Sequence, residues 1–161
     1  MTPETRDKLL RVGAKAIVAA LARHGVRHRA TGRLPATDPF AGDAALALES
    51  CRAGSVLVAD GPSALHRERL AKRGIAGIVA RRELGSVPVA AGDAILRDRD
   101  TMVVIPAPLA DQVAEEAAEA IAFEEFTAEQ VNQGGGVYGL HIPSGERAKA
   151  AFAQWRRMRG R

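Results

Sequence analysis

Two short, uninterrupted apolar runs constrain the fold of this chain more than any other feature. Residues 55–59 and 75–80 contain only small or aliphatic side chains and are flanked by glycines. Runs of this length are typical of strands that are buried on both faces. The segment between them carries Leu65 and Leu70, can be capped by Ser63 and stops at Gly74, which predicts a helix. Strand, helix and strand in this order predict two parallel strands and an α/β fold.

The rest of the chain predicts short strands followed by helices. Strands are expected at 87–89, 94–96 and 102–105, paired as antiparallel hairpins because turn signals separate them. We expect an N-terminal helix over 1–25, irregular structure over 26–40 and a helix from Asp43 to Gly54. Pro106 and Pro108 open a long helix to about residue 133, and a closing helix covers 144–158.

The length and composition predict one domain over residues 1–161 with a C-terminal helical extension over 109–161. Aromatic residues reach only 4% of the chain, so the core must be built from small side chains. Cys51 is the only cysteine, which excludes an internal disulfide and fits a reducing compartment. We expect Cys51 to lie buried in the helix that begins at Asp43. No leader or membrane-spanning run is visible, so a cytoplasmic protein without membrane contact is expected.

The charge is distributed unevenly along the sequence. The formal net charge is +4, yet residues 109–133 hold seven acidic residues and no Lys or Arg. This separation suits docking between subunits at least as well as binding to RNA. Direct RNA binding is the weaker alternative because few aromatic residues accompany the basic ones.

Familiar catalytic signatures are absent, and one charged segment draws attention instead. The sequence contains no Walker loop, dinucleotide fingerprint, HExxH motif or serine nucleophile elbow. Arg82 and Glu83 directly follow the second predicted parallel strand, at the end where α/β sheets bind ligands. Arg82 could grip a carboxylate and Glu83 could hold a hard cation. The alternative is a solvated charge run in a loop.

Five passages in register make the sequence resemble the regulator of ribonuclease activity A (RraA) and metal-dependent aldolase superfamily. They are residues 54–61, 73–79, 91–106, 122–131 and 138–143. The resemblance implies a swivelling β/β/α-type fold that assembles as trimers or hexamers. It also implies either a Mg²⁺- or Mn²⁺-dependent lyase, an aldolase or decarboxylase of small oxo or hydroxy acids, or a non-enzymatic inhibitor of an RNA-degrading enzyme.

The residues that match the family's active site are altered in this sequence. The family pattern, an acidic residue followed about twenty residues later by Arg-Asp, has its nearest equivalent in Glu68, Arg82 and Glu83. By this resemblance Glu68 and Glu83 would hold the metal and Arg82 would bind the substrate. The substrate-binding loop is reduced to a segment containing Gly61 and Ser63, and further strands that normally follow Glu83 are missing.

The acidic helix, in contrast, keeps its Glu129, and the resemblance implies that a C-terminal glutamate reaches a neighbouring subunit's metal site. Glu129 would then complete catalysis in the neighbour; the alternative is one more solvated acid. Two functions therefore remain open. One is a lyase with an altered or lost site, and the other is a non-catalytic binding or regulatory subunit. Such a subunit would join a hetero-oligomer with a longer paralogue or modulate an RNA-degrading enzyme.

Overall fold

The structure is a computed structural model that describes residues 1–27, 29–31, 38–60, 64–99, 101–134 and 146–159. Its helices are α1 (Pro3–Arg23), α2 (Ala64–Lys72), α3 (Arg81–Leu84), α4 (Ala110–Asn132) and α5 (Glu146–Met158), with 3₁₀ turns at Leu48–Ser50 and Ala107–Leu109. Its strands are β1 (Arg29–Thr31), β2 (Phe40–Ala45), β3 (Val56–Ala59), β4 (Gly77–Ala80), β5 (Ala94–Asp98) and β6 (Thr101–Ile105). Contacts divide the chain into two compact units, Met1–Ala117 and Ala118–Arg161.

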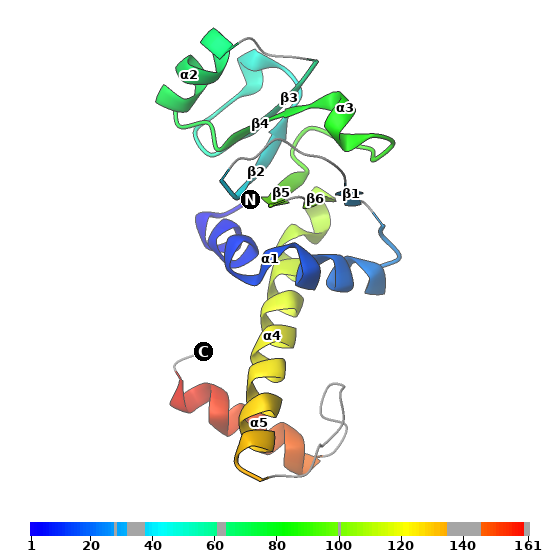
Figure 1. The fold of residues 1–161 in the computed structure, drawn as a ribbon, viewed down its shortest axis with the longest axis vertical. Helices are drawn as coiled ribbons and strands as arrows, with labels where there is room; N and C mark the ends of the chain where they lie inside the picture. The colour runs from blue at the N-terminus through cyan, green and yellow to red at the C-terminus, as the bar shows by residue number, and fades with distance from the viewer. Residues whose placement is uncertain (28, 32–37, 61–63, 100, 135–145, 160–161) are drawn as a thin grey trace. The chain divides into compact units, whose positions relative to one another are not determined.

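The first unit is built on a mixed sheet of six strands in the order β1-β6-β5-β2-β3-β4. β3 pairs in parallel with β4 and with β2, whereas β2, β5, β6 and β1 form antiparallel pairs. The predicted parallel strands and the β5–β6 hairpin are thus confirmed, and the fold is α/β as expected. α2 connects β3 to β4 (Figure 1).

Successive side chains along the strands pack alternately into two hydrophobic cores, one on each face of the sheet. α1 and the first two turns of α4 cover one face, where they pack on Leu96, Val103 and Ile105. The other face holds Val58, Ile95 and Val104 and is closed by Leu84 of α3. Successive residues of β5 and β6 point to opposite faces and are nearly all buried, so both strands are covered on both faces.

The helix predicted from Asp43 to Gly54 is wrong. The chain forms β2 there and then a single 3₁₀ turn. Asp43 pairs with Ala94 of β5 and caps no helix, while Ala44 pairs with Val56 of β3. Pairing with β3 and β5 on both sides has overridden the local helix signal, because tertiary context decides short segments of weak local preference. Cys51 consequently lies half-buried after the 3₁₀ turn and outside any helix.

The strand predicted at 87–89 is also wrong. The segment forms no ladder, although Val87 and Val89 both pack on the core closed by α3. Pro88 between them lacks the N–H group that a strand pairing would require. This segment therefore covers the sheet instead of extending it.

Helix α1 contains a break that its sequence periodicity did not reveal. Gly13 has φ 73° and ψ 168°, outside the helical region, so α1 consists of two helical segments. Positive φ is accessible to glycine at little cost. The Asp98 carboxylate, in the β5–β6 turn, accepts a hydrogen bond from the Ala14 N–H at 3.1 Å and caps the second segment.

The second unit contains the remainder of α4 and α5. Four buried side chains form its core: Ala122, Phe126, Phe152 and Trp155. The rings of Phe152 and Trp155 are stacked with centroids 6.0 Å apart, and Phe123 meets Phe152 edge to face at 5.4 Å. The predicted long and closing helices are both confirmed. None of the described helices is both long and apolar enough to cross a membrane.

Candidate functional site

The candidate site lies at the carboxyl ends of the parallel strands β3 and β4. Ala59 and Ala80 are opposite each other in the ladder, so the residues that follow them, Asp60 and Arg81, leave the sheet together. The Arg81 Nε and Asp60 Oδ2 atoms lie 3.9 Å apart, and both side chains are exposed. An exposed pair at this separation contributes little to stability. The predicted edge exists, and it is open to solvent.

Glu83, a predicted metal ligand, has a structural partner in its own helix. Its Oε2 atom accepts a hydrogen bond from the backbone N–H of Ala80 at 3.1 Å. This contact satisfies one of the donors that every helix start leaves unpaired. The segment is therefore a short helix and not the loop weighed from the sequence, and the Glu83 carboxylate holds its first turn.

Arg82 and Glu68 both point to solvent in the structure. Arg82 lies exposed in the first turn of α3. Glu68 lies on α2, where its carboxylate and the ammonium of Lys72 are 3.3 Å apart and both side chains are more than 70% exposed. Such an i, i+4 pair is a common feature of a solvated helix face.

The described residues of the chain bring no complete metal-ligand set together. No group of three His, Cys, Asp or Glu side chains that could hold a metal ion occurs among them. Gly61 and Ser63, the predicted substrate-binding residues, lie outside the described residues. The roles of Arg82, Glu68 and Glu83 in binding substrate and metal remain predictions.

Glu129 in the second unit is engaged within its own chain. Its Oε2 atom accepts a hydrogen bond from the indole Nε1–H of Trp155 at 2.8 Å, and its Oε1 atom pairs with the Arg159 guanidinium. The Arg159 guanidinium carbon also lies 5.2 Å from the centre of the Trp155 ring. No local pattern signals this arrangement, because Trp155 lies on a different helix and Arg159 directly follows that helix.

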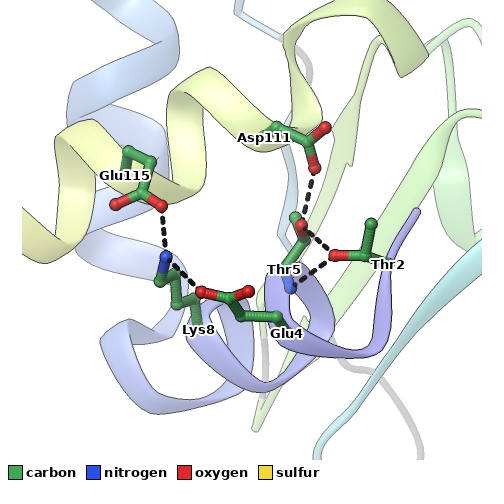
Figure 2. Close-up of polar contacts among 6 residues, drawn as sticks. All are labelled: Thr2, Glu4, Thr5, Lys8, Asp111 and Glu115. Carbon is green, nitrogen blue, oxygen red and sulfur yellow. Dashed lines mark hydrogen bonds and ion pairs between the residues drawn. The ribbon is translucent and has the colours of Figure 1, made fainter.

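A polar network that the sequence analysis also missed joins α1 to the first turns of α4. Figure 2 shows the Lys8 ammonium between the carboxylates of Glu4 and Glu115, and these hydrogen bonds raise the pKa of Lys8. The Thr5 hydroxyl donates to Asp111 Oδ1 at 2.6 Å. The network consists of ion pairs and side-chain hydrogen bonds, which suit helix anchoring.

A second set of polar contacts fixes the end of α1 on α4. The Glu116 carboxylate accepts hydrogen bonds from Arg23 at 3.0 Å and Gln112 at 3.0 Å, and lies 2.9 Å from the His24 ring. Burial raises the pKa of Glu116, but the hydrogen bonds from Arg23, His24 and Gln112 together outweigh it and leave the pKa lowered. The His24 side chain is half-buried against Glu116.

Cys51 lacks the lowered pKa that a reactive thiol needs. Burial raises its pKa more than the nearby Arg73 lowers it. Its sulfur lies 3.6 Å from the carbonyl oxygen of Ala47. Since the thiolate is the reactive form, a raised pKa makes this cysteine less reactive.

Comparisons with known proteins connect this architecture to solved structures at low sequence identity. No protein-family profile matches the sequence, and no curated protein is significantly similar to it. An uncharacterised protein from Pseudomonas syringae pv. tomato superposes with a TM-score of 0.66 at 15% identity, over 93% of this chain and 94% of that one. A chain described as a novel cellulase from microbes of the gut ecosystem gives 0.63 at 13% identity, over 78% and 89%.

The third solved structure names the type of fold. It is RraAS2 from Streptomyces coelicolor, described as an unusual member of the RNase ES inhibitor RraA protein family. The TM-score is 0.60 at 22% identity, over 80% of this chain and 97% of that one. The chain therefore has an RraA-like fold, with a mixed sheet and C-terminal helices, as the five sequence passages predicted. Identities at this level establish the architecture alone.

Proposed function

We propose that this protein is a non-catalytic binding subunit built on the RraA-like fold. The observation that carries the proposal is the use of Glu83: its carboxylate accepts the Ala80 N–H and holds the start of α3. Glu68, the other expected ligand, is paired with Lys72 in solvent. One oxygen of Glu83 is thus committed to its own helix. A site for a hard cation needs several oxygen ligands together, and no group of three such side chains occurs among the described residues.

Two kinds of partner follow from the same fold. One is a longer RraA-like paralogue, with which this chain would form a mixed trimer or hexamer. The other is an RNA-degrading enzyme, in keeping with the description of the Streptomyces relative as part of an RNase inhibitor family. The single cysteine fits a cytoplasmic setting for either partner. Either partner would bind to the surface of this chain, so the proposal does not require Arg82 to bind a substrate.

The test measures cation binding and partner binding on the same preparation of the full chain. Isothermal titration with Mg²⁺ and with Mn²⁺ should show no saturable binding. Assays with oxaloacetate and hydroxy-methyl-oxoglutarate should show no turnover above the rate without protein. Co-purification with a longer paralogue, or inhibition of an RNase E-type enzyme, would support the proposal. Metal-dependent turnover by the isolated chain would refute it.

A second candidate, a lyase of small oxo or hydroxy acids with Mg²⁺ or Mn²⁺, is favoured by one observation. Arg82 is exposed beside Arg81 at the edge where a substrate carboxylate would arrive. Under this alternative Arg82 would bind the carboxylate and a neighbouring subunit would supply Glu129. Its signature would be turnover that a chelator abolishes and that Arg82→Lys reduces, while Arg73→Lys, a change at an exposed arginine of the same unit, leaves it unchanged.

A further inference from the structure

An aromatic cluster links the two helices of the second unit. Among the described residues, Ala122 and Phe126 of α4 and Phe152 and Trp155 of α5 are buried in it, and Phe123 packs against them. Small clusters leave a large role to the polar contacts beside them, so the contacts at the edge of this cluster matter for how firmly α5 is held on α4.

Two of these polar contacts meet at the Glu129 carboxylate, while Arg156 and Glu119 form a separate, longer pair at 3.9 Å. Each oxygen of Glu129 has its own partner: Oε2 accepts from the Trp155 indole at 2.8 Å, and Oε1 pairs with Arg159. The Trp155 side chain is buried at 5% exposure, so its indole N–H would pay a full desolvation cost without an acceptor. Glu129 thus satisfies a buried donor and a cation at the same time.

The three groups also reinforce one another. The Arg159 guanidinium stands over the ring of Trp155 at 5.2 Å, and the indole in turn stacks on Phe152 and meets Phe126 at 5.9 Å. The indole between the two charged groups is buried, and the low local dielectric strengthens the hydrogen bond that its N–H group donates to Glu129. Loss of the carboxylate would weaken all of these contacts together.

We propose that Glu129, Trp155 and Arg159 form a latch that holds α5 on α4, so that α5 opens as one unit when the Glu129 carboxylate is disengaged. In the closed state the latch covers the aromatic side chains and commits Glu129 to its own chain. In the open state Phe126, Phe152 and the Glu129 carboxylate become accessible to solvent. Sub-global opening of a weakly packed element is a general property of proteins.

The experiment compares native-state amide hydrogen exchange of the full chain with that of Glu129→Gln. Glutamine keeps the size of the side chain but removes the charge that pairs with Arg159. Loss of a charge-assisted hydrogen bond should raise the open population, and hence exchange in α5, about five- to tenfold. Amides of β5 and β6 should exchange as in the unaltered protein. Glu124→Gln is the matched control, since Glu124 is exposed on the same helix.

Fluorescence of Trp155, the only tryptophan in the chain, gives an independent readout. Glu129→Gln and Arg159→Met should each shift its emission to longer wavelength and increase its quenching by acrylamide. Complete opening of α5 with an intact sheet would also support the latch. Hydrogen exchange is also measured for Arg159→Met. The proposal is overturned if exchange in α5 changes less than twofold in both Glu129→Gln and Arg159→Met. It is also overturned if Glu124→Gln has the same effect as Glu129→Gln, or if both units lose protection equally.

Discussion

At the scale of single residues, Asp98 shows that the role of an acidic side chain can depend on a backbone N–H group far away in the sequence. Asp98 lies in a hairpin turn, yet its carboxylate caps the second segment of α1 after the break at Gly13. A Cβ atom at Gly13 would stand 3.1 Å from the Asp98 Oδ2 atom, so the glycine provides both the positive φ and the room for the cap. Neither residue would be chosen as important from its local sequence.

Replacing this cap should lower the stability of the first unit. Asp98→Ala removes the acceptor for the Ala14 N–H and should reduce the free energy of unfolding by about 1 kcal/mol, the usual value of a helix cap. Urea denaturation followed by circular dichroism measures the change. Asp98→Asn keeps an acceptor oxygen and should retain most of the stability. Equal losses in the two variants would mean that the charge, and not the cap, is what matters.

Gly77 shows a close approach of a different kind. A Cβ atom there would lie 2.6 Å from the ring of Phe40, so the edge strand β4 packs directly on an aromatic ring of β2. The small-residue composition noted in the sequence has this physical meaning: the elements approach closely because side chains are missing at the contact.

At the scale of elements, α1 is anchored to α4 at both of its ends. Thr5 and Lys8 hold the first segment of α1 on α4, and Arg23 and His24 hold the end of the second segment on α4. These contacts explain how a helix broken at Gly13 still covers one face of the sheet. They also account for three of the acidic residues that sequence analysis assigned to docking between subunits: Asp111, Glu115 and Glu116.

The contacts of Glu116 predict how stability depends on pH. Since folding lowers its pKa below the ordinary value of 4.5, the ionised carboxylate stabilises the folded state above that value. This contribution is lost as the pH falls through the lowered pKa. Glu116→Gln should therefore be less stable than the unaltered chain at pH 7, and the difference should shrink below pH 4.5. Urea midpoints measured from pH 7 to 3 test this, and a constant difference would contradict it.

At the scale of the whole molecule, the two units differ in how they are stabilised. Both cores of the sheet are formed by residues up to Ala117, whereas the second unit relies on four buried side chains and the Glu129 contacts. The predicted helical extension from residue 109 begins inside the first unit. α4 crosses the boundary, and its first turns belong to the core of the sheet.

This division predicts that residues 1–117 fold without the rest of the chain. A variant that ends after Ala117 keeps every side chain of the two sheet cores and should give a cooperative thermal transition by circular dichroism. A fragment with helical signal but no cooperative transition would show that the second unit is needed for folding. The full chain measured in the same buffer is the control.

The sequence by itself determined the elements whose signals are local. The apolar runs of β3 and β4, the hairpin of β5 and β6, and the proline-led start of α4 were predicted because period, turn residues and caps act over a few positions. The five passages in register also led to the RraA-like fold that the solved structures support.

Only the tertiary structure decided which partner each ambiguous segment and each acid received. Residues 40–45 form β2 because β3 and β5 offer backbone hydrogen bonds on both sides, which no local pattern reveals. Glu83 binds the start of its own helix, and Glu129 binds Trp155 and Arg159. A carboxylate has the same chemistry in every sequence, and its role depends on which donor the fold brings within about 3 Å of it.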